Sequence, residues 1–255
     1  MKHLELYKKL EQRYPATLRC PWDNDGIMCM SDPDREVRRV LITLDITEDA
    51  VGKAIEEEFD LILSHHPLIF RGVSHMDVRD SVPRRLLALA GEGITALSYH
   101  TRLDAAKGGV NDALAELLEL EDVSEFEVEG VPMGRIGELA GEMTPKAFAL
   151  YVKQRLDAEQ AVMADGGSSI RRVAVLGGAG DDAVQAAREA GADAFVTGEL
   201  KYHTLSDAHL CDMTLLALGH YETEQPVCQN LYDTLRALLP EAEIEIYHAN
   251  TLYRL

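Results

Sequence analysis

Short apolar runs alternate along this chain with longer stretches in which apolar residues recur every three or four positions. The short runs are typical of buried parallel strands, and the longer stretches are typical of amphipathic helices. The predicted strands are Val40–Leu44, Leu61–Leu63, Ile94–Ser98, Val173–Leu176, Ala194–Thr197, Leu215–Leu218 and Ile244–Tyr247. The predicted helices are Leu4–Arg13, Glu48–Glu58, Pro83–Ala90, Val110–Glu119, Pro145–Leu156, Asp181–Ala190, Tyr202–His209 and Gln225–Leu238. This alternation predicts an α/β protein.

Polar and glycine residues indicate where some of these elements begin and end. Thr47 and Thr144 are predicted N-caps, and Gly91 and Gly191 are expected to end helices. The turn-rich segment Glu127–Pro132 is predicted to be the point at which the chain crosses between two lobes.

Two parts of the chain resemble one another. At one offset and without gaps, the matches are Arg38 to Val40 with Arg171 to Val173, Asp49 to Val51 with Asp182 to Val184, Ala54 with Ala187, and Asp60 with Asp193. Any two α/β segments share some composition, but this run of identities favours an internal duplication of a β-α-β-α-β unit. We therefore predict two related α/β lobes, the first formed by residues 1–126 and 217–255 and carrying the site, the second by residues 127–216.

Histidines and carboxylates follow three of the predicted strands. His65 and His66 follow Leu61–Leu63, and in two further segments a carboxylate lies four residues after a histidine. These later pairs, His100 with Asp104 and His220 with Glu224, fall at corresponding places of the two copies. Sites in open α/β sheets form at the carboxyl ends of parallel strands. A shared metal site is therefore predicted.

The spacing of these residues is compatible with two metal ions. Adjacent residues of an extended chain point in opposite directions, and Pro67 favours an extended conformation at His66. One helical turn places residues four apart on one face. A mixed imidazole and carboxylate set suits two divalent ions of Zn, Fe, Mn, Co or Ni, which lower the pKa of bound water.

The alternative interpretation of each histidine is a capping or surface residue, and this interpretation is kept for His3, His75, His209 and His248. His100 stays open between a ligand and a residue that orients Asp104 or a bound water, or transfers protons. Two glycine-containing segments, Lys107 to Gly109 and Gly177 to Gly180, are expected to be turns. Neither has the spacing of a Walker or a dinucleotide-binding loop.

The composition limits the classes of function. The chain has 255 residues and a formal net charge of −19, which opposes binding to nucleic acid. It contains no apolar run near the ~20 residues that a membrane helix needs, and the first residues lack the apolar core of a signal peptide. We expect a cytoplasmic protein with no membrane partner, whose cysteines Cys20, Cys29, Cys211 and Cys228 are reduced.

Several motifs occur together in the order of a known family. They are Trp22-Asp23-Asn24-Asp25-Gly26, Ser64-His65-His66-Pro67-Leu68-Ile69-Phe70, His100 to Asp112, Thr197-Gly198-Glu199-Leu200, and Gly219 to Glu224. Over nearly its whole length the chain resembles the dinuclear-metal-centre family of GTP cyclohydrolase 1 type 2 homologues, also called Nif-three-like proteins, in the short form that lacks an insertion domain. Arg102 departs from the asparagine frequent in that family, and we expect it to alter the rim of the pocket.

The resemblance implies two related lobes with a dimetal site in the cleft between them, and a homohexamer built as a trimer of dimers. It also implies His65, His66, Asp104, His220 and Glu224 as ligands, with Glu224 bridging two ions.

For function, the resemblance implies a metal-dependent hydrolase in which water opens the purine ring of GTP at C8, acting on a small-molecule substrate that is a nucleotide. His100, ahead of Glu199 and His203, would then handle protons. Two other hypotheses use the same ligands without turnover: a protein that stores or delivers a metal ion, such as an iron chaperone, and a regulatory scaffold that metals stabilise. The ligand set alone does not distinguish the three.

Overall fold

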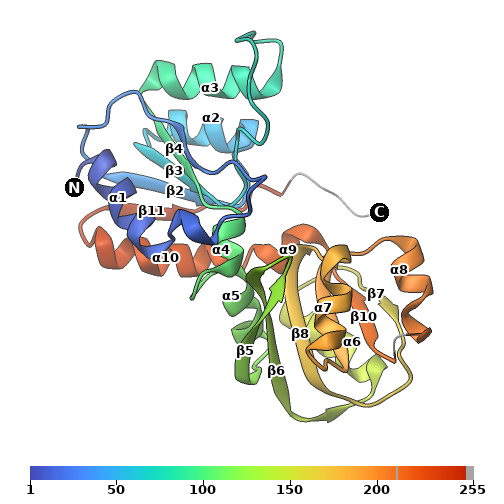
Figure 1. Cartoon of the computed structure of the whole chain (residues 1–255). Coiled ribbons are helices and arrows are strands. Elements are labelled where there is room, and N and C mark those ends of the chain that lie inside the picture. The colour runs from blue at the N-terminus through green and yellow to red at the C-terminus, as the bar shows by residue number, and fades with distance from the viewer. Residues whose placement is uncertain (211, 251–255) are drawn as a thin grey trace. The chain divides into compact units, whose positions relative to one another are not determined.

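The computed structural model describes residues 1–210 and 212–250, which form two compact units (Figure 1). The first unit contains Met1–Leu103 and residues 228–250, and the second contains Asp104–Val227. The chain passes from one unit to the other within the short helix α4 (Thr101–Ala105) and returns at the start of helix α10 (Val227–Leu238).

The first unit is built on a five-stranded sheet of order β1-β4-β3-β2-β11. Its strands are β1 (Gly26–Cys29), β2 (Arg39–Thr43), β3 (Leu61–Ser64), β4 (Thr95–Ser98) and β11 (Glu243–Ile246). The last four are parallel, and β1 pairs with β4 in the antiparallel sense. The helices are α1 (His3–Arg13), α2 (Glu48–Glu56), α3 (Ser81–Glu92) and α10, with a 3-10 turn η1 (Ala16–Leu18).

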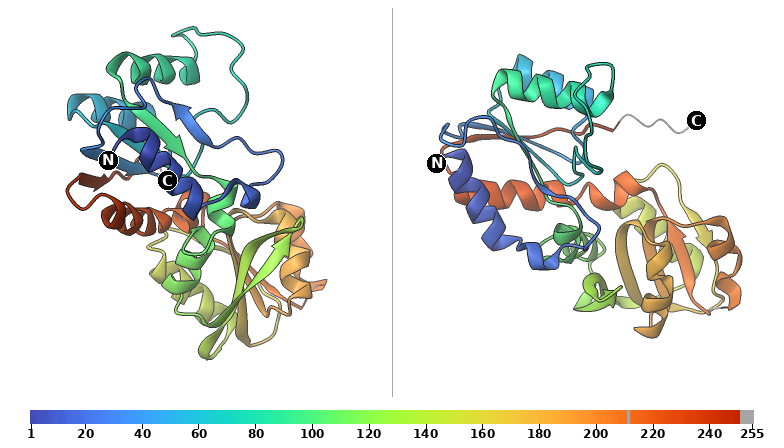
Figure 2. Two further views of the ribbon diagram at one scale, coloured as in Figure 1. Left: turned by 60° about the vertical axis from the view of Figure 1, so that its left-hand side comes forward. Right: turned by 45° about the horizontal axis from the view of Figure 1, so that its top comes forward.

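These helices cover both faces of the first sheet. Leu41, Ile62 and Ala96 are register partners on neighbouring strands, so they point to the same face. There they share a core with Val51 of α2 and Leu86 of α3. Helices α1 and α10 lie against the opposite face (Figure 2, right). Because both faces are covered, the strands have continuous apolar sequences rather than alternating ones.

The second unit has a six-stranded sheet of order β5-β6-β8-β9-β10-β7. Its strands are β5 (Glu121–Val128), β6 (Val131–Met143), β7 (Val162–Ala164), β8 (Ile170–Ala179), β9 (Ala194–Glu199) and β10 (Thr214–Ala217). Strands β8, β9 and β10 are parallel, and the other pairings are antiparallel. The helices are α5 (Val110–Leu117), α6 (Pro145–Arg155), α7 (Val184–Glu189), α8 (Tyr202–Ser206) and α9 (His220–Glu224), with 3-10 turns η2 (Asp181–Ala183) and η3 (Ala208–Leu210).

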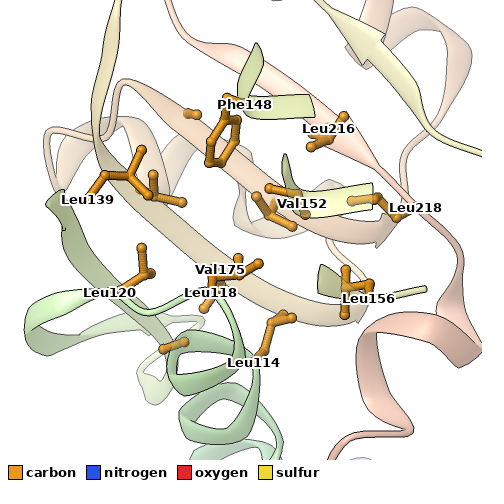
Figure 3. Close-up of a cluster of buried hydrophobic side chains, with 14 of the residues drawn as sticks. Leu114, Leu118, Leu120, Leu139, Phe148, Val152, Leu156, Val175, Leu216 and Leu218 are labelled. Atoms are coloured by element: carbon orange, nitrogen blue, oxygen red, sulfur yellow. The ribbon is translucent and has the colours of Figure 1, made fainter. Parts of the chain in front are cut away.

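Alternate residues of β8 belong to the cores on the two faces of this sheet. Val175 lies with Leu114 of α5 and Val152 of α6 in one buried cluster (Figure 3). The next residue along the strand, Leu176, lies with Ala187 of α7 in the other. The parallel strands of this unit are therefore buried on both faces, as they are in the first unit.

The predicted duplication is confirmed by matching elements and matching hydrogen bonds. The first copy is β2-α2-β3-α3-β4 and the second is β8-α7-β9-α8-β10. Asp60 Oδ2 and Asp193 Oδ2 each accept two consecutive backbone N–H groups at the first strand of their copy, at 2.7–2.9 Å. The donors are Arg38 and Arg39 in the first copy and Arg171 and Arg172 in the second. The identities found in the sequence therefore preserve a specific contact.

All seven predicted strands are present, but four further strands were not predicted: β1, β5, β6 and β7. Strand β5, at the edge of its sheet, has five consecutive exposed residues, so its polar sequence does not show the apolar run of a buried strand. Thus the parallel core of each sheet was predictable, and its antiparallel additions were not. Within the described residues, no helix is long and apolar enough to cross a membrane.

The unit boundaries differ from the predicted ones. They fall after residues 103 and 227 rather than after 126 and 216, so Asp104, His220 and Glu224 belong to the second unit. The segment Glu127–Pro132 is no crossing point, because it contains the hairpin turn between β5 and β6. Glu129 and Gly130 there have φ angles of 52° and 80°, the left-handed pair typical of a tight hairpin turn.

The predicted helix ends are confirmed with one exception. The Thr47 hydroxyl accepts a hydrogen bond from Ala50 N, and Thr144 caps α6 in the same way. Gly191 follows α7 with a φ of 84°. Gly91 was wrong, because α3 continues to Glu92 and is ended by Gly93, whose φ of 69° a residue with a side chain rarely adopts.

Cysteines form no disulfide among the described residues. Cys20 and Cys228 are buried and Cys29 is half-buried, and none of these three belongs to a disulfide. This agrees with the expectation of reduced cysteines for these three; Cys211 lies outside the described residues.

Candidate metal centre

Three histidines gather in the first unit at the carboxyl ends of two neighbouring parallel strands. His65 and His66 follow β3, and His100 follows β4. Their ligand atoms lie within 4.8 Å of one another. The ring centroids are 4.9 Å apart for His65 and His66, 5.3 Å for His65 and His100, and 5.6 Å for His66 and His100. The predicted location at strand ends is therefore confirmed for this part of the site.

In each of these histidines, Nδ1 lies within hydrogen-bonding distance of an oxygen that only accepts. His65 Nδ1 donates to the backbone oxygen of Tyr99 at 3.0 Å, and His66 Nδ1 donates to Asp45 Oδ1 at 2.8 Å. His100 Nδ1 donates to Asp23 Oδ1 at 2.8 Å. Because Nδ1 carries the proton in all three rings, Nε2 of each neutral imidazole has its lone pair available to a metal.

Asp23 is the most strongly held of these acceptors. Its carboxylate also accepts from the backbone N–H and the hydroxyl of Thr101, at 3.1 and 2.7 Å, and its side chain is fully buried. Burial alone raises the pKa of Asp23, but the hydrogen bonds from His100 and Thr101 outweigh it and lower this pKa to about 2. Asp23 is thus a fixed negative charge behind the His100 ring.

The second unit contains another group of candidate ligands, in which carboxylates outnumber histidines. His220 begins α9 and Glu224 lies one turn further on, with Nε2 of the histidine 3.3 Å from Oε2 of the glutamate. The ligand atoms of Asp104 and Glu224 lie within 4.8 Å of one another. His220 Nδ1 lies 3.3 Å from Glu199 Oε1, so this fourth histidine also has a carboxylate on its Nδ1 side.

Glycine makes the position of Glu224 possible. A Cβ atom on Gly178 would lie 2.2 Å from Glu224 Oε1 and 3.1 Å from His220 Nε2, and one on Gly177 would lie 3.1 Å from Glu224 Cγ. Gly198 is as tightly packed, because its Cβ would meet His220 Cα at 2.8 Å. The prediction of a turn at 177–180 was wrong for its first residues: Gly177, Gly178 and Ala179 end strand β8, and the strand passes directly beneath the carboxylate.

The two copies differ at the position of the paired histidines. Gly198 and Glu199 stand in the second copy where His65 and His66 stand in the first. The close packing around Gly198 leaves no space for a histidine there. The group in the first unit is therefore rich in imidazole, and the group in the second unit is rich in carboxylate.

Two other expectations concern α4 and the segment that follows it. The turn predicted at Lys107 to Gly109 is present: Gly108 has a φ of 72° and its N–H donates to Asp112 Oδ2. Arg102 does not line a rim. It is 2% exposed, donates to Asp25 at 2.9–3.1 Å through Nε, and reaches Glu11 at 2.7 Å. It is a structural ion pair inside the first unit.

The remaining histidines lie outside both groups where the structure describes them. His3 is buried and paired with the Thr95 hydroxyl at 2.6 Å, and burial lowers its pKa. His75 is exposed and 2.7 Å from Asp80.

Sequence reasoning did not find the residues that orient the ligands. Asp23 belongs to the quoted motif Trp22–Gly26 without an assigned role, Asp45 was not singled out, and Glu199 was considered only for proton transfer. A usable signal existed for Asp45, because it follows strand β2 at the same edge of the sheet as His65 and His66.

Both groups fit transition-metal ions. Neutral imidazoles oriented through Nδ1, together with carboxylates, form the ligand type that Zn and its first-row neighbours prefer. The donor set is therefore consistent with the predicted metals.

The fold and these residues define an α/β protein with two duplicated units, each bearing a candidate group of metal ligands. A family model described as Duf34/NIF3 (NGG1p interacting factor 3) matches residues 1–252. The chain belongs to this family.

Individual relatives and solved structures agree with that membership. The chain is 32% identical over 251 residues to a protein of Clostridium perfringens named GTP cyclohydrolase 1 type 2 homolog, covering 96% of this chain and 95% of the relative. It is 32% identical over 247 residues to the Protein NIF3 homolog of Schizosaccharomyces pombe, covering 89% and 88%. The crystal structure of Staphylococcus aureus protein SA1388 matches with a TM-score of 0.90 at 27% identity, covering 100% and 99%. Reduced HcgD from Methanocaldococcus jannaschii matches with a TM-score of 0.83 at 26% identity, covering 96% and 97%.

Proposed function

We propose that this protein binds two divalent metal ions in a dinuclear centre and uses them to hydrolyse a small molecule. The residues that would hold the ions are His65, His66, Asp104, His220 and Glu224. The observation that supports this most is the shared Nδ1 pattern of the histidines, each of which has an oxygen acceptor behind it. A histidine that binds a metal through one ring nitrogen is oriented by a hydrogen bond from the other nitrogen to a carboxylate or a backbone oxygen.

The five ligands bring two negative charges against four from two divalent ions, which leaves a net positive centre in an otherwise acidic protein. When bound, such ions polarise the group under attack and lower the pKa of a water molecule. His100, held by Asp23, presents Nε2 beside His65 and His66 and is the proposed site of proton transfer. The proposed reaction is the one that the family resemblance implies, in which water opens the purine ring of GTP, and several relatives are named GTP cyclohydrolase 1 type 2 homolog.

The test is elemental analysis of protein purified without added metal, followed by a turnover assay with GTP and other nucleotides. We expect about two ions per chain and ring opening that His220→Ala and Glu224→Ala abolish with the fold intact. His75→Ala, at an exposed histidine outside both groups, is the matched control and should keep full activity. Activity that persists after complete removal of metal would refute the hydrolase.

Ligand exposure favours a second candidate function, the storage or delivery of a metal ion. The side chain of His66 is 22% exposed and that of His220 is 35% exposed, so an acceptor molecule can approach the ligands. This function predicts bound metal that transfers to a chelating acceptor, and no nucleotide turnover. A regulatory scaffold would instead show a large drop in melting temperature on chelation and no transfer.

We also propose that the chain assembles as a homohexamer, a trimer of dimers, which rests on its resemblance to the family. Light scattering of the metal-loaded protein measures this directly, and a monomeric mass would contradict it. The cytoplasmic location likewise stays a prediction, which cell fractionation tests.

A further inference from the structure

Two exposed aromatic side chains lie against the histidine group of the first unit. The Trp22 ring is 6.1 Å from that of Phe70 and 6.3 Å from that of His100, and Phe70 is 6.0 Å from His100. All three pairs meet edge to face, with interplanar angles between 63° and 81°. The aromatic surface is therefore continuous with the candidate metal ligands.

The exposure of Phe70 differs from that of the other phenylalanines of this chain, and Trp22 is exposed beside it. Trp22 is 57% exposed and Phe70 is 48% exposed. The other four phenylalanines are each at most 8% exposed: Phe59, Phe126, Phe148 and Phe195. Trp22 is the single tryptophan of the chain. Two large apolar side chains left in water at the same place mark a binding surface rather than packing.

The segment that carries Trp22 is firmly held, so the exposure is built into the fold. Asp23 is anchored to the Thr101 backbone N–H and hydroxyl. The Asn24 side-chain amide donates to the backbone oxygen of Ile69, next to Phe70, which ties the two aromatic segments together. The indole ring itself makes no hydrogen bond to any residue of 1–210 or 212–250, so its N–H can serve a ligand.

We propose that Trp22 and Phe70 form the wall that binds a planar heteroaromatic ring of the substrate, such as a nucleobase, beside the histidine group. Exposed aromatic faces bind every nucleobase by stacking, and edge-to-face packing of the two side chains leaves ring faces accessible. Neither Trp22 nor Phe70 carries a charge, so the surface that they form favours an uncharged ring over a phosphate. This inference rests on the proposed function, since it identifies what the substrate presents to that site.

Tryptophan fluorescence tests the proposal, because the emission comes from Trp22 alone. The zinc-loaded full-length protein is titrated with guanosine, which is a ring without phosphate, and with inorganic triphosphate, which is phosphate without a ring. We expect guanosine to quench or shift the emission in a saturable way and triphosphate to leave it unchanged. A response to triphosphate with none to guanosine would overturn the proposal.

Variants then assign the binding energy to the two rings. Calorimetry should show guanosine binding roughly fivefold or more weaker in Trp22→Leu and in Phe70→Leu, because each loses a stacking surface. Phe70→Tyr keeps the ring and should bind like the wild type. Leu150→Ala, at another exposed apolar residue (60%) on helix α6, is the control for general loss of surface. Equal guanosine affinity in all four variants would also overturn the proposal.

The same samples separate this inference from the proposed function. If guanosine binding depends on Trp22 but the protein turns over no nucleotide, the proposed ring-binding role of Trp22 and Phe70 is supported. The proposed hydrolase function is then refuted. If the protein turns over GTP and its KM is the same in Trp22→Leu and Phe70→Leu as in the wild type, the proposed role of the two rings is refuted. The proposed hydrolase function is then retained. If light scattering shows that Trp22→Leu disrupts an oligomer without affecting guanosine binding, the surface is instead a contact with a second copy of this chain, and the proposal fails.

Discussion

A methyl group on Gly178 would lie 2.2 Å from the Oε1 atom of Glu224, far inside van der Waals contact. The strand that carries Gly178 therefore supports the carboxylate of Glu224, a proposed metal ligand. Gly178 also has a φ of 70°, a conformation in which residues with a side chain are strained.

We predict that Gly178→Ala displaces Glu224 and weakens metal binding by roughly 10- to 100-fold, the range seen when a neighbour of a ligand is lost. A competitive chelator titration measures this. Gly141→Ala, in β6 of the same unit, is the control because nothing lies within 4 Å of its added Cβ. Equal metal affinity in the two variants would contradict the role given to Gly178.

Asp45→Ala is predicted to reduce the affinity of the first-unit histidines for metal by roughly 10- to 100-fold, with little effect on the fold. The reason is that His66 loses the acceptor that holds its proton on Nδ1. Asp49→Ala removes a nearby exposed carboxylate of α2 and should bind metal like the wild type. Calorimetric titration with Zn²⁺ compares the two variants. The prediction fails if Asp45→Ala binds as tightly as Asp49→Ala.

The Asp23 carboxylate is predicted to make the free energy of unfolding depend on pH in the acid range. Its folded pKa of about 2 is below the ordinary value of 3.8, so its contribution to stability is complete above pH 3.8 and is lost as pH falls toward 2. The contribution is on the order of 2 kcal/mol at neutral pH. The gap in unfolding free energy between wild type and Asp23→Ala should therefore shrink across that window. Urea titrations at neutral pH and near pH 3 measure it, and a gap independent of pH would contradict the assignment.

The duplicated aspartates should stabilise their own units to different extents. Asp60 is 6% exposed and also pairs with Arg35 at 2.8 Å, whereas Asp193 is only half-buried. Each variant to alanine leaves two backbone N–H groups without their acceptor, at about 1–3 kcal/mol for a buried group. We expect Asp60→Ala to lower the free energy of unfolding by more than Asp193→Ala does.

Native-state hydrogen exchange measures the stability of the two units separately. Asp60→Ala should lower the protection of β2 and Asp193→Ala that of β8. A uniform loss of protection across both units in either variant would show that the aspartates do not act locally.

Local pattern explains why so much of the fold was predictable. Strands such as Leu61–Ser64 are buried on both faces, so their sequence is a continuous apolar run. Such a run is recognisable without reference to any other segment of the chain. The duplication was recognisable in the sequence because Asp60 and Asp193 occupy equivalent positions. Each accepts hydrogen bonds from the equivalent pair of backbone N–H groups, and another residue at that position would lose these bonds. Strand β5 was missed because its exposed edge position permits a charged sequence.

The candidate ligands were also found from the sequence, since they lie in segments that follow predicted strands and belong to a recognisable set of motifs. What they contact was not. The acceptors behind His65, His66 and His100 come from Tyr99, Asp45 and Asp23, at separations of 21 to 77 residues. No local periodicity encodes such pairs.

The sequence by itself determined the α/β class, the duplication, the parallel strands and the identity of the candidate ligands, because each depends on residues close in the chain or on a repeated pattern. Only the tertiary structure decided the tautomers of the histidines, the contact of Gly178 with Glu224 and the exposed pairing of Trp22 with Phe70. These depend on which distant segments pack together, and packing is a property of the folded chain as a whole.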